Sequence, residues 1–267
     1  MNQPQETVGD LLREWRNRRR MSQLDLATDA EISQRHLSFV ESGRSAPSRD
    51  MILHLSERLE IPLRQRNRLL LAAGFAPSFS ERKLDDPSLG AAMGAVHQVL
   101  KGHEPNPAIA VDRYWNMIAA NGSIAPFLEG VADPALLAPP VNVLRLSLHP
   151  RGIAPRIANL AEWRAHLLER LHRQNDTYAD PVLADLETEL KSYPGGLTQT
   201  RVVHNEATAI VHPLRIRMGD TVLSFISTIT VFGTPIDVNL AELAIESFFP
   251  ADDATRFALQ KMSMASA

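Results

Sequence analysis

The sequence of 267 residues contains no cysteine. Without thiols the chain cannot form disulfides, bind a metal through thiolates or use a cysteine nucleophile. This composition fits a reducing compartment, and we expect a cytoplasmic protein. The sequence also lacks any apolar run of about 18 residues, so we expect no membrane-spanning helix. Its start, MNQPQETVGD, lacks the basic and apolar regions of a secretory signal.

The motifs of common enzyme and metal sites are also missing. There is no H-E-x-x-H motif, no glycine-rich phosphate loop, no G-x-S-x-G and no recognisable pair of catalytic carboxylates. The nine histidines are scattered. His166 and His172, for example, are too far apart on a predicted helix to share a face. We therefore expect no catalytic residue, no metal, no cofactor and no enzymatic activity.

The chain has little net charge, but its basic and acidic residues are unevenly distributed. The net charge is only −3 at neutral pH. Residues 1–83 contain 14 Lys and Arg against 11 Asp and Glu, whereas the rest of the chain has 14 against 20. The run RNRRR concentrates positive charge between Arg16 and Arg20. Such a run is typical of a solvated helix end, where cations also suit the helix dipole, and it equally suits an anionic partner.

The first 75 residues have the pattern of five short helices. Val8, Leu11, Leu12 and Trp15 form one apolar face at helical spacing. Serines begin the next three predicted helices and can cap them: Ser22, Ser33 and Ser48. Gly74 stands where a glycine commonly follows a helix.

The second and third predicted helices have helix-turn-helix spacing, from about Gln23 to Ala30 and from Gln34 to Ser42. The third begins with Gln34, Arg35 and His36. Amide and guanidinium groups form paired hydrogen bonds with adenine and guanine, and the N-terminal end of a recognition helix reaches deepest into the major groove. The spacing therefore predicts a DNA-reading helix. A small helical bundle with these side chains on a plain surface is also compatible with it.

Several strings of residues resemble a known family. They are MSQLDLA, ISQRHLSFVESGRSAPS and PLRQRNRLLLAAGFAP in the first part, and DRYWNMIAAN, NVLRLSLHP and FGTPIDVNLAELAIESFFPAD in the second. The chain is similar to phage-repressor-like (XRE) regulators, in particular to bacterial regulators in which this helix-turn-helix precedes an MmyB-like ligand-binding domain. The resemblance covers nearly the whole chain. As a set the strings are specific, whereas a bare helix-turn-helix pattern is shared by many proteins.

The resemblance implies roles for residues of the helix-turn-helix. Together with neighbours at the start and after the end of the third predicted helix, the candidate DNA-binding residues are Gln23, Ser33, Gln34, Arg35, His36, Ser38, Arg44 and Ser45. Of these, Gln34, Arg35 and Ser38 occupy the base-reading positions, and Gln23 and Arg44 the phosphate-binding positions. Phe39, one turn beyond Arg35, is apolar; it could contact thymine methyl groups or pack within the domain, and packing is favoured.

The resemblance also implies a buried ion pair between Arg16 and Glu41. Glu31 stands in the turn where many members have glycine. Either this turn has another geometry, or the domain absorbs a strain on the order of 1 kcal/mol.

The chain divides into three predicted parts. Residues 1–76 form an all-α five-helix domain, residues 77–104 a linker with a connecting helix from Pro87 to Lys101, and residues 105–267 an α+β domain. Predicted strands of the last part are AIAVD, YWNMIAAN, residues 143–149, a long hairpin from residue 207 that turns at Met218-Gly219-Asp220, and ELAIESFFP. Predicted helices begin near Leu160 and Pro181, and DDATRFALQKM forms the last.

For residues 105–267 the resemblance implies a PAS-like fold, which is a curved antiparallel sheet with helices on one side. It also implies a small apolar or fatty-acid-like ligand. The candidate ligand contacts are Trp115, Asn116, Phe127, Arg145 and Phe225, of which Arg145 would pair with an acyl carboxylate. Further candidate wall residues are Leu128, Val143, Leu144, Leu146, Trp163, Ile226, Ile229, Val231 and Phe232. All of these apolar residues are also compatible with plain core packing.

These features predict a homodimeric transcriptional regulator of bacterial type, which binds a double-stranded DNA operator and responds to a small apolar ligand. Two alternatives remain open from the sequence. One is an enzyme with a DNA-binding head. The other is an antitoxin-like or scaffold-like protein, whose second domain binds a protein partner instead of a small molecule.

Overall fold

The computed structural model describes residues 6–178, 180–194, 212–233, 235 and 237–266. The chain forms two compact units. The first comprises residues 1–82 together with 234–241, and the second comprises residues 83–233 with 242–267. The chain therefore passes between the units three times, and a short segment from the second half of the sequence belongs to the first unit.

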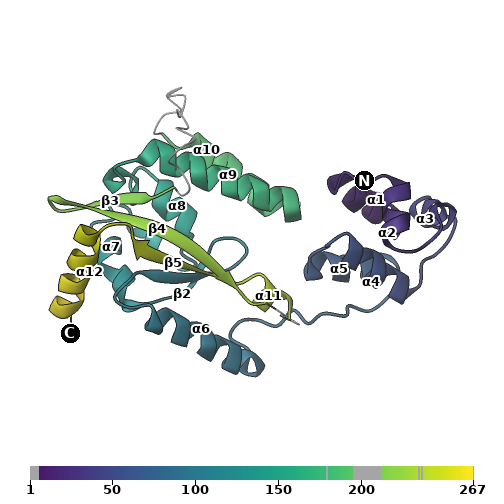
Figure 1. Ribbon diagram of the computed structural model, residues 1–267, viewed down its shortest axis with the longest axis horizontal. Coiled ribbons are helices and arrows are strands. Elements are labelled where there is room, and N and C mark those ends of the chain that lie inside the picture. The colour runs from purple at the N-terminus through teal and green to yellow at the C-terminus, as the bar shows by residue number, and fades with distance from the viewer. Residues whose placement is uncertain (1–5, 179, 195–211, 234, 236, 267) are drawn as a thin grey trace. The chain divides into compact units, whose positions relative to one another are not determined.

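The first unit is a bundle of short helices (Figure 1). Its helices are α1 (Val8–Arg18), α2 (Gln23–Asp29), α3 (Gln34–Glu41), α4 (Arg49–Arg58), α5 (Leu63–Ala72) and α11 (Val238–Ala241). The side chains of Thr7, Ser22, Ser33 and Ser48 cap α1 to α4, each by accepting a hydrogen bond from the backbone N–H three residues later. The predicted serine caps are thus confirmed.

An apolar core holds α3 in place. Leu12 from α1, Leu26 from α2 and Leu37 from α3 are fully buried in one cluster. Since Leu37 faces this core, the start of α3 turns Gln34 and Arg35 to the surface, where both are exposed. The helix is thus fixed on one side and available on the other.

The turn between α2 and α3 keeps a left-handed residue without glycine. Glu31 has a φ of 53°. Its N–H donates to the carbonyl of Thr28, and the following N–H of Ile32 donates to the carbonyl of Ala27, at 3.2 and 2.9 Å. Of the two outcomes considered from the sequence, the second holds. The domain absorbs the strain, of roughly 1 kcal/mol, within a hydrogen-bonded helix end.

The second unit is built on an antiparallel sheet. Its strands in the described residues are β1 (Ala108–Val111), β2 (Met117–Ala120), β3 (Leu214–Met218), β4 (Thr221–Val231) and β5 (Ala244–Pro250). They lie in the order β2-β1-β5-β4-β3, so β5 is central. Glu246 of β5 is paired with Ile109 of β1 on one side and with Ile229 of β4 on the other.

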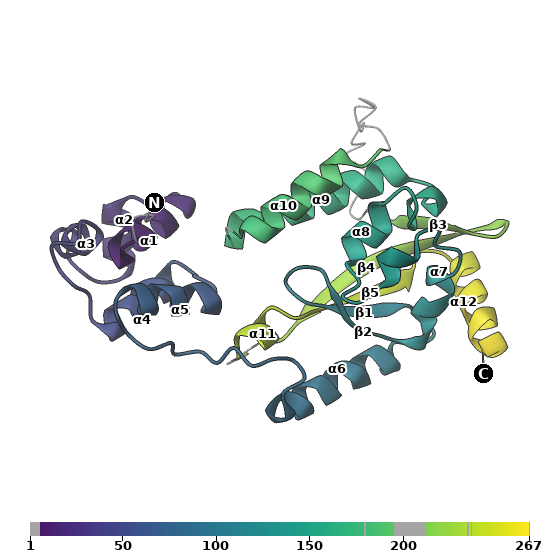
Figure 2. The same ribbon diagram turned by 180° about the vertical axis from the view of Figure 1, so that it is seen from behind.

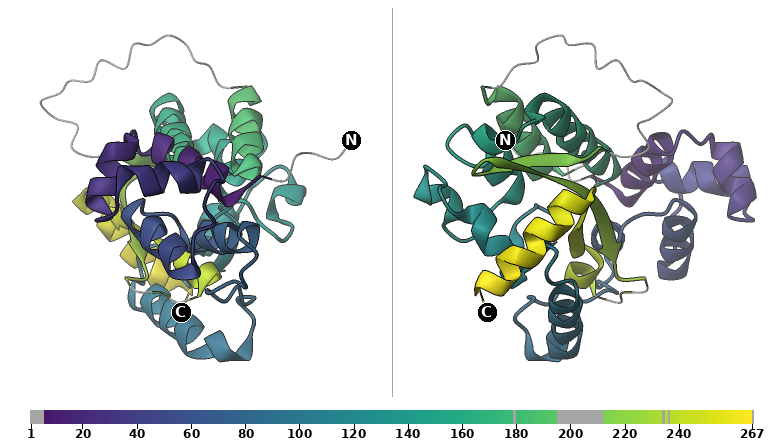
Figure 3. Two further views of the ribbon diagram at one scale, coloured as in Figure 1. Left: turned by 90° about the vertical axis from the view of Figure 1, so that its right-hand side faces the viewer. Right: turned by 60° about the vertical axis from the view of Figure 1, so that its left-hand side comes forward.

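Helices and short 3-10 turns surround this sheet (Figures 1 and 2). They are η1 (Pro87–Leu89), α6 (Gly90–Gly102), η2 (Gly122–Ile124), α7 (Ala125–Leu128), η3 (Pro134–Leu137), α8 (Val143–Leu148), η4 (Ala154–Arg156), α9 (Leu160–Tyr178), α10 (Pro181–Ser192) and α12 (Asp253–Ser266). Helices α9 and α10 run side by side, and α12 packs against β4 and β5 (Figure 3).

Both faces of the sheet carry helices, as the alternation along β1 shows. Ile109 and Val111 pack in a cluster with residues of α8, α9 and α10, whereas Ala108 and Ala110 pack with α6. The expected α+β arrangement with an antiparallel PAS-like sheet is confirmed. The expectation of helices on one side is incomplete, because α6 covers part of the other face.

The strand predicted for residues 143–149 is wrong, because this segment forms α8. Asn142 caps it by accepting a hydrogen bond from the backbone N–H of Arg145, at 3.1 Å. Leu144 and Leu148, four residues apart, join the same buried cluster. The predicted hairpin is present as β3 and β4 with Gly219 in the turn at a φ of 57°. The part of that prediction before residue 212 lies outside the described residues.

Candidate nucleic-acid interface and ligand cavity

The start of α3 presents polar groups at the surface of the first unit. Ser33, Gln34 and Arg35 are exposed, while His36 and Ser38 are half-buried. The Ser33 hydroxyl accepts a hydrogen bond from the His36 N–H at 3.1 Å, so it fixes the first turn. The side chains of Gln34 and Arg35 form no hydrogen bond with other described residues.

Phe39 lies between two arginines of this surface. The guanidinium carbons of Arg35 and Arg44 lie 5.4 and 5.8 Å from the centre of its ring. The carbonyl of Phe39 also accepts hydrogen bonds from the N–H groups of Arg44 and Ser45, at 2.9 and 3.1 Å. Phe39 is half-buried, and its exposed ring face attracts both cations. It is not among the described residues that pack against the core cluster of this unit, and its ring contacts the two arginines instead.

A buried carboxylate behind this surface ties α1 to α3. Glu41 Oε1 accepts a hydrogen bond from Arg16 Nε at 2.7 Å, and Oε2 accepts one from Arg16 Nη2 at 2.9 Å. The side chain of Glu41 is only 1% exposed and that of Arg16 is 10% exposed. Gln23 Nε2 also donates to Glu41 Oε2, at 2.8 Å. The amide nitrogen of Gln23 is thus used within the domain, which leaves its oxygen for other partners.

The charges around Glu41 keep it ionised. Burial alone would raise its pKa, but hydrogen bonds from Arg16 and Gln23, with the positive charge of Arg16 and Arg13, lower the pKa below its usual value. The hydrogen bonds to Glu41 raise the pKa of Arg16 in return. Both groups are therefore charged throughout the physiological range.

The second unit contains an apolar cavity of about 110 Å³ between the sheet and helices α7, α8 and α9. Side chains from the strands form one wall: Ile109, Met117, Leu214, Ile216, Phe225 and Phe248. The helices contribute the other: Phe127, Leu128, Val143, Leu144, Leu146, Ser147, Trp163 and Leu167. A concave, mostly apolar site with few polar groups is typical of small-molecule binding.

The structure places some of the candidate ligand residues in the cavity lining and others outside it. Phe127 and Phe225 both line the cavity, with ring centroids 5.7 Å apart in an edge-to-face arrangement. Arg145 is not in the lining. Its guanidinium pairs with Glu189 at 2.7 Å, and its side chain is 43% exposed. It lies on a helix and not on the expected strand, and this changes the direction in which it points.

Trp115 and Asn116 also lie outside the lining. Trp115 is buried, and its Nε1 donates to Gln174 at 2.7 Å. The amide nitrogen of Asn116 donates to Asp112 Oδ2 at 2.9 Å. These contacts stabilise the connection between β1 and β2.

Four of the expected wall residues are elsewhere. Phe232 packs with the cluster on the α6 face, Ile229 and Val231 are about half exposed, and Ile226 is not in the cavity lining. The prediction treated β4 as one uniform wall. In an antiparallel sheet, alternate residues face opposite sides, and the far end of this long strand extends beyond the cavity.

Sequence reasoning missed Glu246, which is the one ionisable residue among the described lining residues. It lies on β5, on the same face as Phe248, and its side chain is 5% exposed. Arg170 of α9 donates from Nη1 to Glu246 Oε1 at 3.0 Å, and its guanidinium stacks over Trp115 at 4.2 Å. An acidic residue in the mostly apolar string LAIESFF was the available signal.

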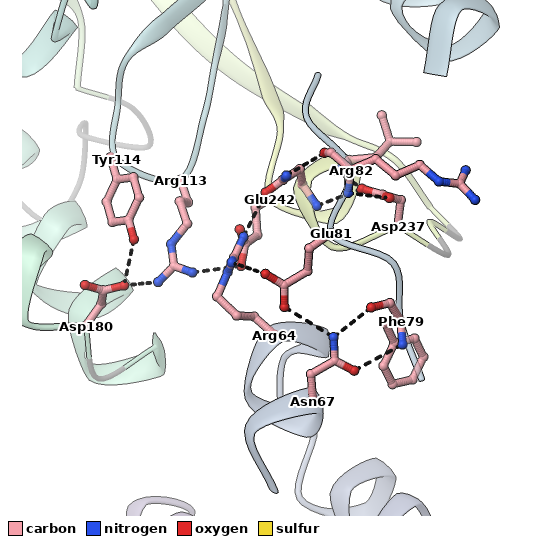
Figure 4. A network of polar contacts seen from close by, with 12 residues as sticks. Arg64, Asn67, Phe79, Glu81, Arg82, Arg113, Tyr114, Asp180, Asp237 and Glu242 are labelled. Carbon is pink, nitrogen blue, oxygen red and sulfur yellow. Dashed lines mark hydrogen bonds and ion pairs between the residues drawn. The ribbon is translucent and has the colours of Figure 1, made fainter. Parts of the chain in front are cut away.

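Polar side chains attach α11 to the rest of the first unit (Figure 4). Arg64 of α5 donates to Glu81 and to Asn239 of α11, at 2.7 and 2.8 Å. Asp237 accepts a hydrogen bond from the N–H of Arg82 at 3.2 Å, and Asn239 Nδ2 donates to the carbonyl of Arg82 at 2.6 Å. The segment before β5 is thus held by several bonds to α5 and to the chain that follows it.

Polar side chains in the second unit join distant parts of that unit (Figure 4). The guanidinium of Arg113, after β1, bonds to Asp180 at the start of α10 and to Glu242 just before β5. The hydroxyl of Tyr114 also donates to Asp180, at 3.3 Å. All three charged side chains are almost fully buried. They fix the end of β5 that leads to residue 241.

Comparison with known families identifies two domains in the chain. Residues 12–65 match the model of a helix-turn-helix, and residues 93–262 match the MmyB-like transcription regulator ligand binding domain. A comparison with curated proteins found no match. No helix in the described residues has the length and apolar character needed to cross a bilayer. Since the second match covers more than half of the chain, the protein belongs to the MmyB-like transcription regulators, with an N-terminal helix-turn-helix for binding DNA and a C-terminal ligand-binding domain.

Proposed function

We propose that this regulator reads a specific DNA operator with the start of α3, and that a small apolar molecule in the cavity of the second unit changes its affinity for that operator. The observation that carries the proposal is the cavity of about 110 Å³ with an almost entirely apolar lining, in a chain that also exposes Gln34 and Arg35 on a helix-turn-helix. In this proposal the protein acts by binding, without catalysis. It works in the cytoplasm, where it meets DNA.

The DNA-reading part is tested by replacing one base-reading side chain. Arg35→Ala should cost about 1–3 kcal/mol of operator binding and should relax the preference at one base position. Operators are selected from a random DNA pool, and affinities are measured by fluorescence anisotropy at fixed salt. Arg68→Ala, an exposed arginine of α5 paired with Glu6, is the matched control. Full operator affinity of Arg35→Ala would refute the assignment of α3.

The apolar lining supports the proposal of an apolar ligand, but it gives less support to a fatty acid as that ligand. A carboxylate head group needs a basic partner, and Arg145 is engaged with Glu189 outside the cavity. No Lys, Arg or His is among the described lining residues. Native mass spectrometry of the purified protein should detect a bound small molecule. A purified protein that is empty, and whose operator affinity is unchanged by extracted cellular lipids, would remove the ligand part of the proposal.

Chain connectivity supplies a route from the cavity to the DNA-binding unit. Phe225 of β4 and Phe248 of β5 line the cavity, and the chain between these strands passes through residues 234–241, which belong to the first unit. A ligand that prefers one position of the two strands would therefore bias α11 and, through Arg64, the helix α5. Such a bias equals the difference in ligand affinity between the two states.

This route is tested at Asp237, whose Oδ2 bonds to the N–H of Arg82 and whose Oδ1 accepts from the N–H of Asn239. Asp237→Ala should leave ligand binding and operator binding largely intact, while the effect of extracted lipids on operator affinity shrinks. Asp220→Ala, in the exposed turn between β3 and β4, is the control. An unchanged ligand effect in Asp237→Ala would contradict the route.

The proposed active form is a homodimer, because recognition helices of this type bind two half-sites about 34–36 Å apart. Exposed apolar side chains on α6 and the sheet offer contact surfaces: Val99, Val222, Ile229 and Val231. Analytical ultracentrifugation with and without operator DNA measures the assembly. A monomer at all concentrations, alone and on DNA, would contradict this part.

A further inference from the structure

The cavity carries one feature that its apolar character does not explain, which is a buried carboxylate. Glu246 lies in the central strand, paired with Ile109 and Ile229, and its side chain is 95% buried. On an apolar wall, an ionised group costs free energy unless hydrogen bonds and an opposite charge compensate it. The carboxylate of Glu246 therefore needs hydrogen-bond donors and a positive charge close to it.

The described residues supply only part of that compensation. Glu246 Oε1 accepts a hydrogen bond from Arg170 Nη1 at 3.0 Å. Among the described residues, Oε2 accepts no hydrogen bond, and Glu246 itself lines the cavity. A carboxylate oxygen can accept two hydrogen bonds, so this lining side chain has capacity for a further donor.

We propose that the cavity selects a small apolar molecule with a neutral hydroxyl, an alcohol or a phenol, which donates its hydrogen to Glu246 Oε2. This inference rests on the ligand part of the proposed function and names the chemical class. The other polar lining side chain, Ser147, already accepts a hydrogen bond from Trp163 Nε1 at 3.1 Å. Ser147 is uncharged, whereas Glu246 is a carboxylate, so Glu246 is the stronger hydrogen-bond acceptor in the described lining.

The charges of Glu246 and Arg170 favour a neutral ligand over a charged one. Arg170 neutralises Glu246, and Arg170 itself is not in the lining. A ligand carboxylate would meet the like charge of Glu246 without facing the guanidinium, and a ligand ammonium would leave one uncompensated positive charge in the buried pair. A neutral donor satisfies Oε2 and adds no net charge.

The size of the cavity limits the apolar part. An apolar cavity of about 150 Å³ holds a benzene molecule, and the cavity here has about 110 Å³. The two volumes are of the same order, so molecules with one aromatic ring or a short branched chain are suitable probes.

Four probes of matched shape test the proposal in the full chain: toluene, benzyl alcohol, benzylamine and benzoate. Binding is measured at neutral pH by ligand-observed NMR titration. Benzyl alcohol should bind about tenfold more tightly than toluene, because hydrogen bonds to charged groups are among the stronger ones. Benzylamine and benzoate should bind more weakly than benzyl alcohol.

Two variants should change this order in opposite directions. Glu246→Gln removes the negative charge and leaves that of Arg170, so the advantage of benzyl alcohol should shrink and benzoate should gain. Arg170→Met leaves the carboxylate alone, so benzylamine should gain, and it provides the test if Glu246→Gln does not fold. Glu169→Gln, an exposed neighbour of Arg170 on α9, should keep the wild-type order.

The outcomes separate this inference from the proposed function. If toluene binds but benzyl alcohol binds no more tightly, or if benzoate binds as well as benzyl alcohol, the hydroxyl class is wrong while the apolar site stands. An unchanged order in both variants would also overturn it. If none of the four probes binds, both the inference and the ligand part of the proposed function fail.

Discussion

The buried ion pair of the first unit gives the sharpest prediction about stability. Glu41 is 1% exposed and accepts two hydrogen bonds from Arg16 and one from Gln23. Glu41→Ala removes these acceptors and leaves the guanidinium of Arg16, itself 10% exposed, without its partner. Breaking one side of a buried pair typically costs about 3–5 kcal/mol, which is a large part of the stability of a small domain.

Hydrogen–deuterium exchange of the full chain measures this loss in the first unit separately from the second. Amides of α1 and α3 should exchange with an unfolding free energy lower by about 3–5 kcal/mol in Glu41→Ala. Glu14→Ala breaks an exposed pair with Arg18 and should cost about 0.5 kcal/mol or less. The double variant Arg16→Met/Glu41→Leu should recover most of the loss, because an apolar pair needs no charge partner.

Two results would refute this reasoning. One is a loss below about 1 kcal/mol in Glu41→Ala, which would mean that water reaches the freed guanidinium at little cost. The other is a double variant that is no more stable than Glu41→Ala. Packing between α1 and α3, and not charge compensation, would then account for the role of the pair.

Three further predictions concern the same unit. Glu31→Gly should stabilise it by about 0.5 kcal/mol, because relief of the left-handed φ exceeds the entropy cost of glycine, and Glu31→Val should lower the melting temperature. Gly9→Ala should destabilise the unit by about 1–3 kcal/mol, since a new Cβ would lie 2.5 and 2.8 Å from the carbonyl oxygens of Val40 and Glu41; an unchanged melting temperature would contradict this close approach. On acidification, the contribution of Glu41 should be full above its usual pKa of 4.5 and should be lost as the pH falls through its lower folded pKa. Exchange measured down to acidic pH should show this loss in the wild type and less of it in Glu41→Gln.

The helices of the first unit could be predicted because their signals are local. Ser22, Ser33 and Ser48 mark helix starts, and apolar spacing marks the buried faces. The antiparallel sheet was predicted from alternation and from the turn at Gly219. The segment 143–149 misled the prediction because leucines at every second position suit a strand, whereas the cap by Asn142 and the burial of Leu144 with Leu148 produce a helix.

The cavity was only partly predictable for a related reason. Phe127 and Phe225 were identified by their apolar character, but many other apolar residues had the same character. Arg145 was chosen as the polar partner because it stands among leucines, and Glu246 stands among equally apolar neighbours. Which of the two faces the cavity depends on the pairing of β5 between β1 and β4 and on the position of Arg170 in α9. Such long-range pairing has no local signal in the sequence.

The short segment at residues 234–241 has a consequence for protein engineering. Because it belongs to the first unit although it comes late in the chain, a truncation after residue 82 would remove α11 and its bonds to Arg64 and Arg82. A DNA-binding part cut out at residue 82 would lack residues 234–241. The ligand-binding part alone would carry these residues as a loop without the unit to which they belong. A usable exchange of parts needs two junctions and a grafted hairpin instead of one cut.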